Sequence, residues 1–263
     1  MNLQPSNAFV GIFDILGFKA LRATKSTAGL HQLYIRGILP AIQHAAAGKS
    51  KSAVVDGQRV LVPDFTAASL NYRVFSDTVV YFSANDSFDS FFKIVNSASS
   101  LLQHGFGARS PFRGAIGWGD LINDPRGILL GGGIEDAYIG ESSQAWAGAM
   151  LTTLCGEFAE RHGYLNRYTS LHLEAAAQAQ DEIKRRNATE NARRLVPYNV
   201  PIQKNPKDGP AVYEVQQAYA IDWTIRMYEG ASSKSFAPSD SSHAQTLAAN
   251  TQAFESWARR HNR

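Results

Sequence analysis

Two short apolar runs, each interrupted by an aspartate, constrain the fold of this chain more than any other feature. The first runs from Phe9 to Phe18 and contains Asp14, and the second runs from Tyr72 to Phe82 and contains Asp77. Both are rich in β-branched and aromatic residues, which is typical of strands. A carboxylate among such neighbours is costly unless a cation or hydrogen bonds balance its charge. If the two strand ends converge, the aspartates predict a site for a hard divalent metal ion.

The elements around these runs predict a ferredoxin-like sheet of the α/β (α+β) class. In chain order they are a strand over 8–13, a helix over 30–42, strands over 69–76 and 78–83, a helix over 88–102 and a strand over 112–118. A βαββαβ order gives the strand order 4-1-3-2 with antiparallel neighbours. The end of the first strand then meets the hairpin between the second and third strands, and Asp14 lies beside Asp77.

The remaining segments predict helical and strand additions to this core. The polar stretch 48–63, with an Asp56-Gly57 turn, fits either a hairpin or a loop. Helices are predicted from the glycines at 131–133 to about His162, over 173–194 and over 245–260, and strands over 196–202 and 212–223. We expect one domain over residues 1–263, with a core over about 8–165 and a C-terminal extension over about 166–263.

Composition narrows the functional classes. Of the 263 residues, 44% are hydrophobic and 19% are charged, which is enough to bury a core, and the net charge is +3. No helix-turn-helix or aromatic RNA-binding strand motif is present, so we expect no nucleic-acid partner. The single cysteine, Cys155, reads as a core residue, and the histidines have no zinc-site spacing. No apolar stretch approaches the roughly 20 residues of a membrane span, and we expect a cytoplasmic location.

Four segments resemble, in order and spacing, the core motifs of class III nucleotidyl cyclases. They are FDILGF from Phe13, RVFSD from Arg73, RGAIGWGD from Arg113 and GGGIEDAYIGE from Gly131. Details such as Lys19 and the later Tyr198-Asn199-Val200-Pro201 are more similar to the bacterial anti-phage pyrimidine cyclases of the Pycsar systems. Those enzymes make cyclic UMP or cyclic CMP as an alarm signal. The resemblance implies a cyclase core, a ribonucleoside triphosphate substrate and a partner effector that senses the product.

The resemblance also implies the site residues. Asp14 and Asp77 would be catalytic and, with the main-chain carbonyl of Ile15, would hold two divalent ions, Mn²⁺ or Mg²⁺. One ion would acidify the ribose 3′-hydroxyl and the other would clamp the triphosphate. Phe13 and the turn Gly17-Phe18-Lys19 are expected to contact the nucleotide, the turn through backbone N–H groups at a helix start.

Arg73 and Tyr72 are expected to choose the base. Arg73 precedes Asp77 by four residues, so it should share a strand face with it. Its guanidinium only donates, which suits the O2 and O4 carbonyls of uracil better than the amine of cytosine. Tyr72 would limit the size of the pocket. The predicted activity is a uridylate cyclase acting on UTP, and a cytidylate cyclase is the nearest alternative.

The chain departs from the purine cyclases at two positions. Where those enzymes place a transition-state asparagine and, four residues later, an arginine, this sequence has Glu135 and Ile139. Neither can stabilise a phosphorane, so Lys19 or a cation of the 185–194 cluster would have to act instead. Because class III sites are shared between subunits, we expect a homodimer. The alternative of another class is a catalytically inactive, nucleotide-sensing protein on the same fold.

Overall fold

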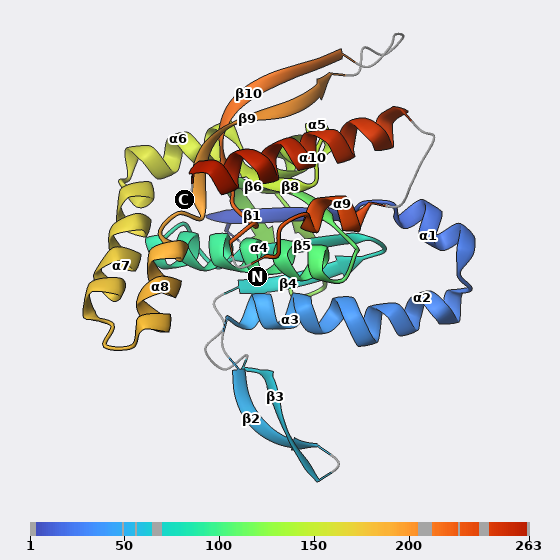
Figure 1. Cartoon of the computed structure of the whole chain (residues 1–263), viewed down its shortest axis with the longest axis horizontal. Coiled ribbons are helices and arrows are strands. Elements are labelled where there is room, and N and C mark those ends of the chain that lie inside the picture. The colour runs from blue at the N-terminus through green and yellow to red at the C-terminus, as the bar shows by residue number, and fades with distance from the viewer. Residues whose placement is uncertain are drawn as a thin grey trace.

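A computed structural model describes residues 4–48, 50–55, 57–64, 70–204, 212–225, 227–236 and 242–261 (Figure 1). Asp56 of the predicted turn and Ser69, the first residue of a predicted strand, lie outside these ranges. None of the helices in the described ranges is both long and apolar enough to cross a membrane.

One mostly antiparallel sheet forms the centre of the molecule. Its order is β4-β5-β1-β6-β8-β10-β9, with a short β7 (Leu129–Leu130) paired to β6. The strands are β1 (Ser6–Ile15), β4 (Leu70–Phe75), β5 (Thr78–Ser83), β6 (Phe112–Asn123), β8 (Gly148–Leu151), β9 (Leu195–Lys204) and β10 (Val212–Ile221). Only the β6–β8 pair is parallel among these neighbours. The four strands β1, β4, β5 and β6 confirm the predicted 4-1-3-2 order, and the fold class is confirmed with them.

The crossover from β1 to β4 is helical, as predicted, but it starts earlier and carries an insertion. It contains α1 (Phe18–Thr24), α2 (Thr27–Leu33), a π-helical turn η1 (Tyr34–Ile38) and α3 (Leu39–Ala47). The undecided stretch 48–63 is a hairpin of β2 (Ser50–Val55) and β3 (Gln58–Pro63), which forms a separate two-stranded sheet. Figure 1 shows this hairpin projecting from the body of the molecule.

The two faces of β1 are buried against different helices, because successive side chains of a strand point to opposite faces. Phe9 and Phe13 belong to the large core that includes the apolar side of α4 (Phe88–Gly107). Val10 and Ile12 belong to a smaller core with Ala137 of α5 (Gly132–Ser143). Each fully buried side chain of this size stabilises the fold by roughly 1.5 to 3 kcal/mol. β1 is therefore held from both faces as well as from both edges.

Glycines let α5 lie unusually close to β6. A Cβ atom at Gly117 would come within 2.6 Å of the Ala137 nitrogen, and one at Gly119 within 2.7 Å of the Gly133 nitrogen. Any other residue would push the helix away from the sheet. The prediction that a helix begins at the glycines 131–133 is confirmed, since α5 begins at Gly132.

Two predicted helices are in fact interrupted. Where one helix over 131–162 was expected, α5 ends at Ser143, the chain forms β8, and a second helix, α6 (Thr153–Arg161), follows. The stretch 145–151 is entirely buried, and a short buried apolar run has no periodicity that separates a strand from a helix. The expected helix over 173–194 is two helices, α7 (Tyr164–Gln178) and α8 (Glu182–Asn191). Asp181 caps the start of α8, because its side chain accepts a hydrogen bond from the Lys184 N–H at 2.9 Å.

Cys155 is buried in α6, as expected for a core residue. The C-terminal strands β9 and β10 continue the central sheet beyond β8.

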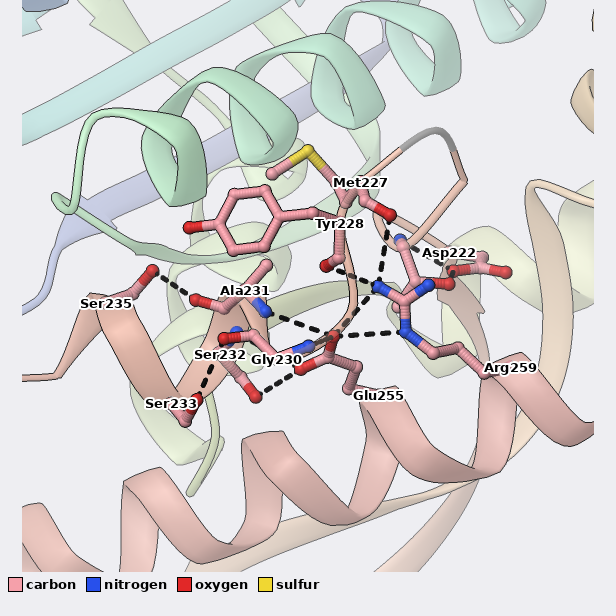
Figure 2. A network of polar contacts seen from close by, with 11 residues as sticks. Asp222, Met227, Tyr228, Gly230, Ala231, Ser232, Ser233, Ser235, Glu255 and Arg259 are labelled. Atoms are coloured by element: carbon pink, nitrogen blue, oxygen red, sulfur yellow. Dashed lines mark hydrogen bonds and ion pairs between the residues drawn. The ribbon is translucent and has the colours of Figure 1, made fainter.

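A buried carboxylate ties the last helix to the core. Glu255 of α10 (Ser242–His261) accepts the N–H groups of Gly230 at 2.9 Å, Ala231 at 3.2 Å and Ser232 at 3.1 Å, at the start of α9 (Ala231–Ser235). Figure 2 shows these bonds together with the Ser232 hydroxyl and the Arg259 guanidinium, which also bind Glu255. Burial alone would raise the pKa of Glu255, but the bonds from Ser232 and Arg259 hold it below its usual value.

We predict that Glu255→Ala lowers the free energy of unfolding by about 2 to 4 kcal/mol, because it leaves buried N–H groups without their acceptor and Arg259 without its carboxylate partner. Urea denaturation measures the change. The matched control is Glu174→Ala on α7, where the carboxylate is exposed and the expected change is below about 0.5 kcal/mol. Equal losses in the two variants would contradict the role given to Glu255.

Candidate active site

Asp14 and Asp77 lie where β1 ends and the β4–β5 hairpin turns. In the strand registers Asp14 is opposite Thr78 on one side and opposite Arg113 on the other. Asp77 occupies the two-residue turn, and its main-chain carbonyl accepts the Ile15 N–H at 3.1 Å. The Thr78 hydroxyl donates to the Asp14 carboxylate at 3.3 Å. The fold therefore brings the two predicted aspartates to one edge of the sheet.

The charge of this edge is unfavourable to Asp14. Burial, followed by the negative charges of Asp77 and Glu141, raises the pKa of Asp14 to about 6, against the opposing effects of Arg113 and Thr78. Two carboxylates that repel each other gain most from a cation placed between them.

The donor set fits a divalent ion that arrives with its substrate. The predicted set is two carboxylates and the main-chain carbonyl of Ile15, and hard oxygen ligands of this kind would suit Mg²⁺ or Mn²⁺. Within the described ranges no three His, Cys, Asp or Glu side chains form a group that could hold a metal by themselves. Mg²⁺ in particular is commonly bound by one or two carboxylates, with water and substrate phosphates completing its coordination.

Tyr34, which the sequence did not single out, fixes the turn that carries Asp77. Its hydroxyl donates to the carbonyl of Ser76, a residue held at a positive φ of 56°. Such a conformation is strained for a residue other than glycine and needs support from its surroundings. Burial, followed by the charges of Asp77 and Asp14, raises the pKa of Tyr34 to about 12, so it stays a donor at neutral pH.

Arg113 and Glu141 form a second unpredicted part of the site. The Arg113 Nε donates to the Glu141 carboxylate at 2.7 Å, and its Nη1 donates to the Gln144 carbonyl at 3.1 Å. The two side chains are only 15% and 6% exposed. Burial raises the pKa of Glu141, and Arg113 opposes that rise. Arg113 is thus a fixed positive charge beside Asp14, and its place in the RGAIGWGD segment is the one sequence signal for it.

The predicted phosphate-binding turn has the backbone of a helix start. Gly17 adopts a left-handed φ of 78° before α1, and Lys19 is exposed in the first turn. The first N–H groups of a helix have no partner within it, so they are available to an anion. Phe18 packs edge-on against Tyr34, with ring centres 6.1 Å apart. The Phe13 ring is fully buried against Tyr81, so only its main chain remains a candidate for nucleotide contact.

Arg73 shares a face with Asp14, though not for the expected reason. β4 ends at Phe75, so the four-residue spacing to Asp77 crosses the turn and fixes no face. The register instead pairs Arg73 with Val80, two residues from Thr78, and Thr78 is opposite Asp14. Arg73 is exposed, and its guanidinium lies 5.5 Å from the centre of the Phe82 ring.

Tyr72 faces the opposite side of the sheet from Arg73. It pairs with Tyr81, and its hydroxyl accepts from the Gln43 amide of α3 at 3.1 Å. This corrects the expectation that Tyr72 and Arg73 flank one base, since neighbouring strand residues alternate between faces.

Neither α5 nor α8 offers a residue that could act in place of the asparagine and arginine that purine cyclases have at these two positions. Glu135 is exposed in the first turn of α5, and the Ile139 side chain is 58% exposed. The 185–194 cluster belongs to α8 and the start of the following segment, on the opposite side of the molecule from α1, which follows Asp14 (Figure 1). Arg113, opposite Asp14 in the sheet, is the cation that lowers the pKa of Asp14.

We predict that Asp14→Asn stabilises the metal-free protein at pH 7.5 by about 1 to 2 kcal/mol, allowing for solvent screening. The raised pKa means that ionised Asp14 opposes folding, and this cost appears as the pH rises from about 4 through about 6. Thermal unfolding in EDTA at pH 4 and pH 7.5 measures the difference, which should vanish at the lower pH. Mn²⁺ should then stabilise the wild type and not the variant. A wild type that is indifferent to Mn²⁺ would contradict the metal assignment.

We predict that Tyr34→Phe weakens Mn²⁺ binding by about three- to tenfold, because one hydrogen bond to the Ser76–Asp77 turn is lost. Titration of the Mn²⁺-induced rise in melting temperature gives the affinity. Tyr138→Phe is the control, since this tyrosine is 60% exposed on α5. An unchanged Mn²⁺ affinity in Tyr34→Phe would remove Tyr34 from the site.

No protein-family model and no curated protein matches this chain. Among solved structures, the monomeric guanylyl cyclase domain of the RhoGC fusion protein from the aquatic fungus Blastocladiella emersonii aligns with 15% identity and a TM-score of 0.43, over 60% of this chain and 86% of that domain. The catalytic core of a rhodopsin-guanylyl cyclase with converted specificity, in complex with ATPαS, aligns with 14% identity and a TM-score of 0.42, over 82% of this chain and 96% of that core. The function of this chain is therefore inferred from its own residues and geometry.

Proposed function

We propose that this chain is a metal-dependent nucleotidyl cyclase of the class III type. In the proposed reaction the ribose 3′-oxygen attacks the α-phosphorus of a ribonucleoside triphosphate, its bond to that phosphorus forms, and pyrophosphate leaves. The observation that carries the proposal is that Asp14 and Asp77 lie close together at one edge of the sheet. Their mutual repulsion contributes to the raised pKa of Asp14. The four motif segments that resemble class III cyclases, which include both aspartates, support it.

Asp14, Asp77 and the Ile15 carbonyl would hold the divalent ions. When bound, these ions supply acidification of the 3′-hydroxyl and neutralisation of the triphosphate. Thr78 orients the Asp14 carboxylate, and Tyr34 orients the turn that carries Asp77. The N–H groups that follow Gly17, with Lys19, would bind the terminal phosphates. Arg113 offsets part of the negative charge around Asp14.

We infer that UTP is the substrate and cyclic UMP the product. Arg73 supports this choice, because it is exposed on the face that Asp14 occupies and it can only donate hydrogen bonds. Once a bound base excludes water from Arg73, facing the amine of cytosine would leave the guanidinium without an acceptor at a cost of about 1 to 3 kcal/mol. A cytidylate cyclase remains the alternative within the class.

We infer a homodimer, and the shortage of cations around Asp14 in one protomer supports it. Arg113 lies beside Asp14, and Glu135 and Ile139 offer no positive charge at the positions where purine cyclases place Asn and Arg. A second copy would complete the site. The resemblance to the Pycsar enzymes supports the further proposals of a cytoplasmic anti-phage alarm signal and an effector that senses it.

The decisive experiment incubates the pure protein with each of the four ribonucleoside triphosphates and Mn²⁺ or Mg²⁺, followed by mass spectrometry of the products. We expect cyclic UMP from UTP. The second candidate is an inactive nucleotide sensor, which the exposed Glu135 and Ile139 favour. Binding of a nucleotide with no cyclic product from any of the four would overturn the enzyme in favour of the sensor.

We predict that Asp14→Asn and Asp77→Asn each lower turnover by at least about a hundredfold while the protein stays folded, since each removes a ligand and little core volume. Product formation measured with saturating Mn²⁺ checks this. Glu157→Gln, an exposed carboxylate on α6, is the control and should keep full activity. Activity retained in either aspartate variant would exclude that residue as a metal ligand.

We predict that UTP exceeds CTP by roughly ten- to a hundredfold in kcat/KM and that Arg73→Ala removes most of this preference. Competition between the two substrates gives the ratio. Arg59→Ala, on the separate β2–β3 hairpin, should leave it unchanged. An equal loss for both substrates in Arg73→Ala would assign Arg73 to the phosphates or to the fold.

A further inference from the structure

A pocket of about 620 Å³ lies between α6, the base of the ribbon formed by β9 and β10, and the C-terminal end of α10. Figure 1 shows these three parts of the chain on the side of the molecule away from α1. The pocket begins at Leu151, the last residue of β8, whereas Gly148 at the start of β8 is opposite Arg113. Its lining shares no residue with the candidate active site, and its volume is within the range of small-molecule sites, about 300 to 1,000 Å³.

Two neighbouring aromatic rings line the pocket. Tyr198 of β9 and Trp257 of α10 lie against each other, with ring centres 5.0 Å apart and planes inclined by 52°. Both residues are partly buried, and burial raises the pKa of Tyr198, so its phenol is neutral at neutral pH. The face of such a ring attracts a positive charge that lies within about 6 Å of the ring centre.

A tyrosine holds a carboxylate of α6 in this pocket. The Tyr219 hydroxyl donates to Oε1 of Glu160 at 2.6 Å. This bond, followed by burial, raises the pKa of Tyr219 to about 12, so the phenol stays a donor at neutral pH. Oε2 of Glu160 makes no hydrogen bond or ion pair with any residue in the described ranges. The bond from Tyr219 therefore orients the carboxylate without cancelling its charge.

The charged side chains of the lining are all acidic. Glu157, three residues before Glu160 on α6, is exposed and forms no ion pair within the part of the chain that the structure describes. Among the described residues that line the pocket none is Lys, Arg or His, although the whole chain has a net charge of +3. His261 stacks on Trp257 with ring centres 4.4 Å apart, but it lies outside the lining. Like charges one helical turn apart repel each other, and a bound cation would relieve that repulsion.

We propose that this pocket binds a small organic cation, an alkylammonium ion whose charged head lies between Glu160 and the rings of Tyr198 and Trp257. The carboxylate selects the positive charge, and the rings contact the carbon groups around it and keep water from one side of it. A bare ion would leave most of the 620 Å³ to water, so carbon groups on the nitrogen are part of the fit.

The experiment uses the full chain without divalent ions and three probes: choline, butylammonium and 3,3-dimethylbutan-1-ol, which is the uncharged isostere of choline. Isothermal titration calorimetry gives the affinities, and the indole N–H signal of Trp257 in NMR spectra reports on the pocket. Choline or butylammonium should shift this signal and bind at least about tenfold more tightly than the alcohol. Binding of choline alone assigns a quaternary ammonium, and binding of butylammonium alone assigns a primary ammonium that donates to Glu160.

Two variants locate the site. Glu160→Gln removes the charge and keeps an oxygen that can accept from Tyr219, and Trp257→Leu removes one ring. Each should weaken binding of the organic cation at least about threefold. The matched controls are Glu174→Gln, an exposed carboxylate on α7, and Tyr213→Leu, an exposed ring on β10 outside the pocket, and both should leave the affinity unchanged. If Trp257→Leu does not fold, Glu160→Gln still tests the site.

Three results would overturn the proposal: no binding of choline or butylammonium at concentrations up to about 10 mM, binding of the alcohol as tight as that of choline, or undiminished binding in Glu160→Gln. Loss of binding in Asp14→Asn would also overturn it, because the cation would then lie at the candidate active site. The test needs no turnover, and Asp14→Asn should bind the probes as the wild type does, so its outcome is separate from that of the proposed cyclase.

Discussion

The double pairing of β1 is the constraint on which the rest of the structure depends. This strand bonds to β5 along one edge and to β6 along the other, and its two faces contribute to two different cores. A shift of one residue in its register would send Phe9 and Phe13 to the α5 side and expose Asp14 to the α4 side. Because so much apolar area depends on one register, the position of the Asp14 carboxylate is fixed by the core itself.

The candidate site gains its precision from elements that are remote in sequence. Tyr34 comes from the crossover, Thr78 from the β4–β5 hairpin and Arg113 from β6, and each acts on Asp14 or on the turn next to it. This arrangement accumulates negative charge from Asp14, Asp77 and Glu141 against one buried guanidinium. This excess of negative charge costs free energy in the cation-free protein, and cations bound in the working state would offset that cost.

The strands that alternate between two cores could be predicted from sequence because their composition and turn residues are local signals. β8 could not, since residues 145–151 form a short apolar run without a clear period, and the pairing that makes part of them a strand is with β6, about 35 residues earlier in the chain. Tyr34 was missed because neither a π-helical turn nor a bond to Ser76 leaves a mark in the sequence. The spacing of Arg73 to Asp77 fixes no face because strand parity is lost across the turn, whereas Tyr72 and Arg73 point to opposite faces because they are neighbours in one strand.

The contacts that hold α10 against residues 145–147 affect the stage of synthesis at which this part of the chain can fold. Thr251 accepts the Ala147 N–H at 2.8 Å, Asn250 donates to the Ala145 carbonyl at 2.7 Å, and Phe254 covers the Trp146 ring at 4.6 Å. Residues 145–147, which precede β8, therefore keep their apolar surface exposed and these backbone groups unpaired until α10 has left the ribosome. Until then the nascent chain is a client for chaperones, and messages truncated before α10 yield products that quality-control proteases can recognise.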